Sequence, residues 1–210
     1  MKIGFIGCGN MAKAIIAGLI KTNTFLPEEI IASDNSEKAL SDAKNMYGIN
    51  TTVNNSELVL ESEMILLAVK PQVIASVINE ICDTVSENKI IISIVAGQSI
   101  DRIESLFGRN IKLIRTMPNT PALCGEGMTA VCANGNVTDV ELAYALKILS
   151  SFGKAEVVSE KLMDAVVAVS GSSPAYVAMF IEAMADAAVA EGMPRAQAYT
   201  FAEQAVYGTA

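Results

Sequence analysis

The stretch KIGFIGCGNMA, residues 2–12, decides the fold of this 210-residue chain. Its first five residues form a short, mostly apolar run bounded by glycine, which is typical of a β-strand. The spacing Gly7-x-Gly9-x-x-Ala12 follows and opens a helical pattern. The first glycine permits a tight turn, the second lets backbone approach a pyrophosphate, and the small third residue lets the helix pack on the strand. We therefore predict a βα unit that binds NAD(H) or NADP(H), with the helix amides facing the phosphates.

Short apolar runs alternate with amphipathic segments through the first two thirds of the chain. This alternation predicts right-handed βαβ crossovers and a largely parallel sheet. The run MILLAV is continuously apolar and IIISIVA is interrupted only by Ser93, which is typical of strands covered by helices on both faces. The predicted strands are 2–6, 30–33, 64–69, 89–95, 111–116 and 128–132, with 155–158 weaker, and the predicted helices are 10–21, 36–47, 71–81, 99–107 and 138–152.

After about Ser159 the alternation stops and helical patterns cover 161–169, 174–191 and a segment that begins at Pro194. These helices are rich in Ala and Met and apolar over much of their circumference, so they need several neighbours. We infer that partner subunits, or residues beyond Ala210, complete the bundle. The chain is therefore divided into a dinucleotide-binding domain, 1–160, and the first part of a helical oligomerisation and substrate domain, 161–210.

Composition excludes several classes of function. The formal net charge is −8 and the 15 basic residues form no run, which argues against a nucleic-acid partner. The longest apolar run, AYVAMFI at 175–181, has seven residues and is too short for a membrane span, and no signal peptide is recognisable. The four cysteines form no C-x-x-C pair and histidine is absent, so we expect no metal site, no Ser-His-Asp or Cys-His mechanism, and a reducing cytoplasm.

A polar turn, Ser33-Asp34-Asn35-Ser36, ends the second predicted strand. A carboxylate at this place accepts hydrogen bonds from a ribose 2′-hydroxyl and favours NAD, whereas hydroxyl and amide groups with a nearby cation tolerate the 2′-phosphate of NADP. Asp34 points to the first cofactor and its neighbours point to the second. Capping of the next helix by Asp34 or Ser36 explains the same residues equally well.

Three further loops follow predicted strands or open a helix. Ligands of open α/β sheets lie outside the carboxyl ends of the strands, so Ala68–Pro71 and Val95–Gly97 should border the nicotinamide, with Lys70 either the nearest cation or a solvated strand end. Met117–Pro121 is either a ligand-facing loop or a plain turn. Ser170–Pro174 places Ser173 as the N-cap of a helix, either as an anion site or as an ordinary cap.

Five segments of the chain are informative when taken together: GFIGCGNMAKAI (4–15), AVKPQ (68–72), IVAG (94–97), MPNTPAL (117–123) and VSGSSPAYVAMFIEAMADAA (169–188). Together they resemble pyrroline-5-carboxylate reductase, and the resemblance covers essentially all 210 residues. It implies a Rossmann-type, mostly parallel α/β domain followed by an all-helical C-terminal dimerisation domain. It also implies a cytoplasmic oxidoreductase that reduces 1-pyrroline-5-carboxylate to L-proline with NADPH or NADH, the last step of proline biosynthesis.

The resemblance also implies which residues meet the ligands. Family members continue past Ala210 with a glycine-rich S-P-G-G-T-T loop and a threonine beside the substrate nitrogen, so we expect this chain to be truncated, which leaves its activity open, and assign no catalytic residue. The cofactor is expected against Gly7, Cys8, Gly9, Asn10, Met11, Ser33, Asp34, Asn35, Asn55, Ala68, Val69, Lys70, Pro71 and Ala96, and the substrate side at Asn119, Thr120, Ser170, Gly171, Ser172 and Ser173.

The mechanistic hypothesis is hydride transfer from the nicotinamide to the carbon of a cyclic C=N bond. A protonated imine is already electrophilic, so the protein mainly positions it, and helix amides near Ser172 and Ser173 would anchor its carboxylate. One alternative is a β-hydroxyacid dehydrogenase, which requires a lysine on the first long helix, whereas residues 174–190 contain none. The other is a nucleotide-binding module without turnover.

Overall fold

One eight-stranded sheet organises the computed structural model, which describes residues 2–210. The strand order is β3-β2-β1-β4-β5-β6-β7-β8, and every neighbouring pair is parallel except β6 and β7. The predicted α/β fold with a mostly parallel sheet is confirmed. The strands are β1 Ile3–Ile6, β2 Ile30–Ser33, β3 Asn50–Thr52, β4 Met64–Leu67, β5 Ile90–Ser93, β6 Lys112–Met117, β7 Gly127–Ala133 and β8 Gly153–Val157.

Nine α-helices are found among residues 2–210, with short 3₁₀ turns between several of them. Ser36 and Ser99 cap α2 and α5 through their side chains, and Gly48 ends α2 in the left-handed conformation, in keeping with the residue types favoured at these positions. The helices are α1 Asn10–Lys21, α2 Glu37–Tyr47, α3 Asn55–Glu61, α4 Ile74–Ile81, α5 Ile100–Phe107, α6 Asp139–Leu149, α7 Met163–Val166, α8 Ser173–Ala190 and α9 Arg195–Thr209.

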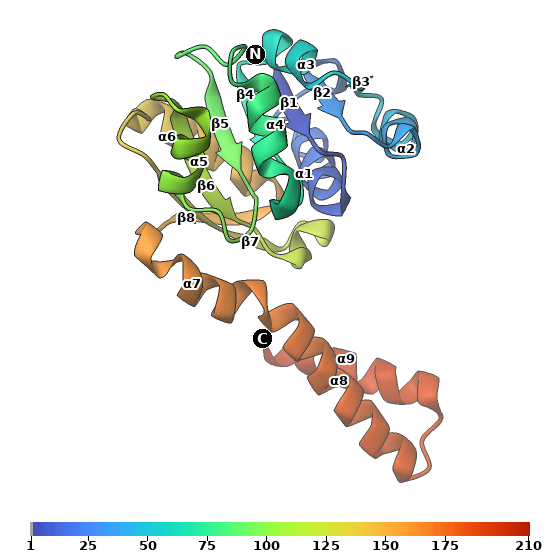
Figure 1. The fold of residues 1–210 in the computed structure, drawn as a ribbon. Coiled ribbons are helices and arrows are strands. Elements are labelled where there is room, and N and C mark those ends of the chain that lie inside the picture. Colours follow the sequence, from blue (N-terminus) through green and yellow to red (C-terminus); the bar gives the residue numbers. More distant parts are fainter. Residues whose placement is uncertain (1) are drawn as a thin grey trace.

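Helices cover both faces of the sheet, which explains the continuously apolar strands. Side chains alternate along a strand, so Met64 and Leu66 of β4 pack into one core while Ile65 and Leu67 pack into the other. Helices α1, α2 and α6 contribute to the first core, and α3, α4 and α5 contribute to the second (Figure 1). Strands β1 to β6 are parallel, so their carboxyl ends all lie at the same end of the sheet.

Two elements that lie between α2 and β4 in the chain, β3 and α3, are not predicted from the sequence. Strand β3 is three residues long, polar and at the sheet edge, so it lacks the apolar run that reveals the other strands. Helix α3 is seven residues long and contributes only Leu58 and Val59 to the core. Asn54 caps this helix by accepting a hydrogen bond from the backbone N–H of Glu57, which makes an N-cap the local signal for it.

The predicted break between the last helices at Ser170–Ser173 is wrong. Helix α7 continues through a π-helical turn, Val167–Gly171, directly into α8, so that residues 160–190 form one helical stretch. The backbone N–H of Ser172 donates to the carbonyl of Val167 at 2.9 Å. A π-turn adds one residue to a helical turn, which sequence periodicity does not reveal, and such turns are frequent at functional sites.

The arm formed by α8 and α9 projects from the α/β domain (Figure 1). Its two helices pack through small residues, Ala185, Ala198 and Ala202. Large apolar side chains on the same arm stay exposed, including Met179 at 66% and Phe180 at 58%. The stretch 160–190 is long and apolar enough to cross a membrane by length and composition alone, a property that helices at subunit interfaces share.

Candidate nucleotide-binding site

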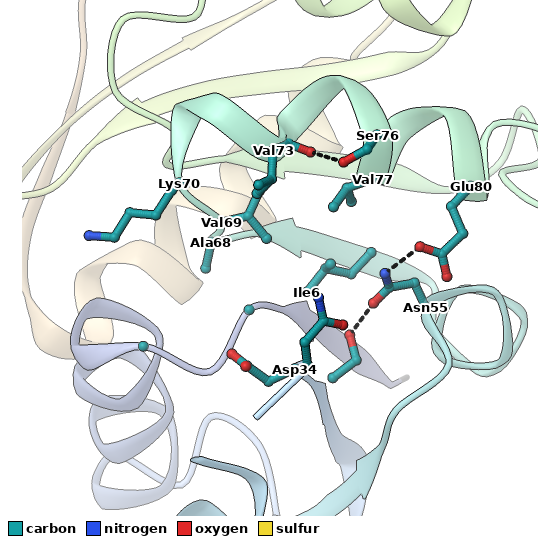
Figure 2. A pocket seen from close by; sticks show the side chains of 14 residues that line it. Ile6, Asp34, Asn55, Ala68, Val69, Lys70, Val73, Ser76, Val77 and Glu80 are labelled. Atoms are coloured by element: carbon teal, nitrogen blue, oxygen red, sulfur yellow. Dashed lines mark hydrogen bonds between the residues drawn. The ribbon is translucent and has the colours of Figure 1, made fainter. Parts of the chain in front are cut away.

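A cavity of about 340 Å³ opens at the carboxyl ends of β1, β2 and β4, the edge at which open α/β sheets bind ligands (Figure 2). Helix α4 forms its opposite wall. The residues that line it are Ile6, Gly7, Gly9, Ser33, Asp34, Asn35, Asn55, Ala68, Val69, Lys70, Val73, Ser76, Val77 and Glu80. The structure thus brings together most of the residues predicted for the cofactor, which come from four separate segments of the sequence.

Gly7 occupies a turn that only glycine fits without strain. Its φ is +99°, and its backbone N–H donates to the carbonyl of Ser33 at 2.8 Å. A Cβ built on Gly7 would lie 2.6 Å from the carbonyl oxygen of Ala68, on the loop that follows β4. The glycine therefore permits both the backbone conformation and the close approach of two strand ends.

Gly9 has a different role, because nothing in the protein fills the space in front of it. A Cβ built there has no neighbouring atom within 4 Å, and Gly9 lines the cavity. Gly9 is also the N-cap of α1 and supplies no side-chain cap, so the first amides of the helix face the opening without an intrahelical partner. This combination of free space, free N–H groups and the positive end of a helix fits a pyrophosphate.

Asp34 ties the turn after β2 to the glycine turn. One carboxylate oxygen accepts the backbone N–H of Cys8 at 2.8 Å, and the other accepts the backbone N–H of Ser36 at 2.9 Å. The side chain of Ser36 accepts the N–H of Ala39 and so caps α2. The sequence left open whether this turn caps α2 or faces a cofactor. In the structure Ser36 caps the helix, while Asp34 lines the cavity.

A chain of side-chain hydrogen bonds crosses the far end of the cavity. The hydroxyl of Ser33 donates to Asn55 at 2.6 Å, and the amide of Asn55 donates to Glu80 at 2.9 Å (Figure 2). Glu80 was not among the predicted site residues. The sequence feature that could have indicated Glu80 is its spacing from Val73 and Val77, which places the three residues on one face of α4 and the turn before it.

Five of the predicted cofactor residues do not line this cavity. Cys8 lies within the glycine turn with its side chain buried in the core, and burial raises the pKa of its thiol. Asn10, which is exposed, and Met11, which is partly buried, follow Gly9 at the start of α1. The five are Cys8, Asn10, Met11, Pro71 and Ala96.

The predicted substrate side forms a separate junction between the α/β domain and the long helix. The amide nitrogen of Asn119 donates to the carbonyl and to the hydroxyl of Ser170, both at 3.2 Å. Its amide oxygen accepts the backbone N–H of Met128 at 2.8 Å. Both amide hydrogens and one oxygen lone pair of Asn119 are thereby used. Asn119 thus links the α/β domain to the long helical stretch by hydrogen bonds.

The anion site expected at Ser172 and Ser173 stays a prediction. The backbone N–H of Ser172 donates to the carbonyl of Val167 at 2.9 Å, so this amide already has a partner within the chain. Helix α8 begins at Ser173, with Pro174 in its first turn, directly after the π-helical turn. Among residues 2–210, no group of three or more His, Cys, Asp or Glu side chains is placed to hold a metal ion.

Comparison with known proteins adds the family to this geometry. The profile described as "NADP oxidoreductase coenzyme F420-dependent" matches residues 2–97, and the one described as "Pyrroline-5-carboxylate reductase dimerisation" matches residues 160–210. Pyrroline-5-carboxylate reductase of Escherichia coli (strain K12) is 48% identical over 209 residues, which cover 100% of this chain and 78% of that protein.

Two solved structures are similar over almost the whole chain. Plasmodium falciparum pyrroline carboxylate reductase with NADP bound has a TM-score of 0.90 and 35% identity, and covers 99% of this chain and 76% of that one. The Coxiella burnetii pyrroline-5-carboxylate reductase has a TM-score of 0.92 and 35% identity, with 99% and 77% covered. These similarities agree with the cavity at the glycine turn and with the helical arm. The chain therefore belongs to the pyrroline-5-carboxylate reductase family.

Proposed function

We propose that this chain binds NADPH or NADH in the cavity and reduces 1-pyrroline-5-carboxylate to L-proline, the last step of proline biosynthesis. The observation that carries the proposal is the glycine turn. Gly7 is wedged against the Ala68 carbonyl while Gly9 leaves open space before the amides of α1, in a chain 48% identical to a protein of this name. A turn of this shape admits a pyrophosphate and has no evident structural need for a second glycine.

We further propose how the predicted residues divide the cofactor. Gly7 to Met11 hold the pyrophosphate. The backbone N–H groups of Gly7 and Cys8 are bonded to Ser33 and Asp34, so the amides that start α1 would make these contacts. Ser33 to Asn35 and Asn55 meet the adenosine half, and Ala68 to Pro71 with Ala96 border the nicotinamide. Support comes from strand order, since β1 lies between β2 and β4, and a dinucleotide spanning the switch in strand order would run in this direction.

The reduced nicotinamide, when bound, supplies a hydride to the carbon of the imine C=N bond. A protonated imine already carries the proton that the amine nitrogen needs, so hydride addition yields the neutral secondary amine without a proton donor from the chain. This accounting suits a sequence that contains no histidine. The residues of this chain position the two reactants, and orientation of this kind lowers a barrier by roughly 7 to 11 kcal/mol at best.

Asn119, Thr120 and the Ser170–Ser173 segment are proposed to face the substrate. Asn119 acts as a positioning residue, because its amide fastens the π-helical turn at Ser170 to the loop after β6. The hydroxyl groups of this turn then lie at a place fixed relative to the sheet. The β-hydroxyacid dehydrogenase alternative gains no support, since α8 carries no lysine.

The wider assignments are proposals as well. We place the boundary between the dinucleotide-binding and helical domains at residue 160, where the dimerisation profile begins. We propose a homodimer or higher oligomer through the C-terminal helices, a cytoplasmic location, and neither nucleic acid nor membrane as a partner. The net charge of −8 supports the exclusion of nucleic acid. The match to the dimerisation family supports a second subunit, rather than lipid, as the partner of the exposed apolar arm.

The reaction is tested directly with the protein as the cell makes it. On addition of 1-pyrroline-5-carboxylate we expect consumption of NADH or NADPH and formation of an equal amount of L-proline, followed by absorbance and amino-acid analysis. Cofactor binding without any reduction of the imine would instead identify a nucleotide-binding module. Oxidation of a β-hydroxyacid with NAD(P)⁺ would favour the dehydrogenase alternative.

The oligomer is tested by sedimentation. The wild-type protein should sediment at twice the 22.1 kDa chain mass or more, because Met179 and Phe180 expose apolar surface that water does not favour. Phe180→Glu should shift the protein toward monomer by placing a charge in that interface. The matched control is Val140→Glu, since Val140 is 80% exposed on α6, outside the arm. A wild-type monomer would contradict the proposal.

A further inference from the structure

We propose that this chain selects NADH over NADPH and that Asp34 is the residue that makes the selection. The inference rests on the proposed function to the extent that the cavity holds a nicotinamide dinucleotide. Its basis is the fixed position of one carboxylate at the end of β2 and the charges of the side chains around it (Figure 2). A specificity-determining residue is thereby assigned where the sequence alone pointed to both cofactors.

The Asp34 carboxylate is fixed from two sides. The backbone N–H groups of Cys8 and Ser36 bind its two oxygens at 2.8 and 2.9 Å, and these donors come from different loops. Turning the side chain away from the cavity would give up both bonds. Each oxygen nevertheless keeps a further lone pair, so the carboxylate can still accept a hydrogen bond from a ribose hydroxyl.

The polar side chains that face Asp34 across the cavity are already bonded to one another. The hydroxyl hydrogen of Ser33 is directed to Asn55, and the Asn55 amide donates in turn to Glu80, a second carboxylate on the cavity wall. The cavity therefore carries two acidic side chains at its adenosine end.

The one cationic side chain among the lining residues lies elsewhere. Lys70 follows β4, which β1 separates from β2, and parallel neighbours are about 4.8 Å apart. In Figure 2 the Lys70 ammonium lies well apart from the Asp34 carboxylate and points away from it. Lys70 is thus placed for the nicotinamide half and leaves the charge of Asp34 without a counter-ion from the cavity wall.

A 2′-hydroxyl and a 2′-phosphate meet this arrangement with opposite results. The hydroxyl is a hydrogen-bond donor and satisfies a lone pair of Asp34. The phosphate brings between one and two negative charges at neutral pH and no hydrogen to donate, and like charges brought together across an interface are strongly unfavourable. Because Asp34 is half-buried, salt and water screen this repulsion only in part.

The experiment is a titration of the whole protein with NADH and with NADPH, followed by nicotinamide fluorescence, in the absence of imine and at low ionic strength. We expect the wild-type Kd for NADH to be lower by at least about tenfold. Asp34→Asn keeps the size of the side chain and one acceptor oxygen but removes the charge. It should reduce the preference by at least about tenfold, chiefly through tighter binding of NADPH.

Asp42→Asn is the matched control, because Asp42 is exposed on α2 outside the cavity and its substitution changes the net charge of −8 by the same amount. It should leave the ratio of the two Kd values unchanged. Asp34→Ser, a second uncharged variant, covers the case in which Asp34→Asn does not fold. Equal or tighter binding of NADPH by the wild type, or an unchanged ratio in both uncharged variants, would overturn the proposal.

The titration also separates this inference from the proposed reaction. Selective binding of NADH without reduction of the imine would sink the reaction and leave the selection by Asp34 standing. Reduction of the imine with both cofactors equally would do the reverse. Failure to bind either cofactor would contradict both.

Discussion

Replacing Gly7 with alanine should both destabilise the protein and abolish cofactor binding. The substitution forces a φ of +99° on a residue with a Cβ and drives that Cβ to within 2.6 Å of the Ala68 carbonyl oxygen. Backbone strain of this kind costs roughly 1 to 3 kcal/mol, and the clash with fixed backbone adds a comparable amount. We expect a loss of about 3 kcal/mol in the free energy of unfolding, measured by thermal and denaturant unfolding.

Gly9→Ala is the comparison that gives the Gly7 result its meaning. Nothing in the protein lies within 4 Å of the added methyl group, so the free energy of unfolding should change by less than about 1 kcal/mol. The same methyl group would occupy the space in front of the α1 amides. Binding of NADH should therefore weaken by at least about tenfold while the fold stays intact.

The two substitutions should therefore differ, since Gly7→Ala affects both stability and binding whereas Gly9→Ala affects binding alone. If Gly9→Ala binds the cofactor as tightly as the wild type, the pyrophosphate does not lie on this turn. If Gly7→Ala unfolds at the wild-type temperature, the close approach to Ala68 is not a constraint on the fold. Titration and unfolding of both variants in the same buffer distinguish these outcomes.

The ion pair between Arg115 and Glu160 should have the second largest effect. Glu160 begins the helical stretch that leads to the arm, and it accepts Arg115 from β6 and the backbone N–H of Ile100, each at 2.8 Å. The Arg115 side chain is 14% exposed and that of Glu160 is 32% exposed. Arg115→Met leaves a half-buried carboxylate without its cation, which we expect to destabilise the protein by about 1 to 3 kcal/mol in denaturant unfolding.

This loss should depend on pH in a defined direction. Burial raises the pKa of Glu160, but the hydrogen bond from Ile100 and the guanidinium of Arg115 outweigh it, so the folded-state pKa lies below the ordinary value. A depressed pKa contributes stability above the unfolded pKa, and that contribution disappears as the pH falls through the folded value. The difference between wild type and Arg115→Met should therefore be full at neutral pH and shrink below about pH 4.

Lys112→Met is the matched control that separates a general loss of an ion pair from an effect on the helical arm. Lys112 pairs with Glu141 on the other side of β6, at the edge where α6 begins, and this contact also holds the pKa of Glu141 low. It does not touch the helical arm. If the Lys112 and Arg115 variants lost stability equally and only Arg115→Met changed the sedimentation of the oligomer, the Arg115 pair would be assigned to the placement of the arm. A pH-independent effect of Arg115→Met would refute the electrostatic explanation.

Local chemistry in the sequence was sufficient for the parts of this protein that depend on neighbours along the chain. The apolar runs, the glycine turn, the caps at Ser36 and Ser99 and the apolar C-terminal helices all follow from residues within a few positions of one another, where steric and hydrogen-bonding preferences act directly. The same signals predicted a mostly parallel sheet, since alternation leaves few other ways to connect strands.

The tertiary structure decided what depends on residues far apart in the chain. Only the fold brings Asp34 to Cys8, Asn119 to Ser170 and Glu80 to Asn55, pairs separated by 26, 51 and 25 positions. Hydrogen bonds of this kind leave no periodicity in the sequence. The same is true of the π-helical turn at Val167–Gly171, where the backbone hydrogen bonds continue although the helical spacing of side chains is interrupted. The sequence therefore determined the glycine turn and the class of cofactor, while the geometry around Asp34 and Asn119 assigned each polar side chain its partner.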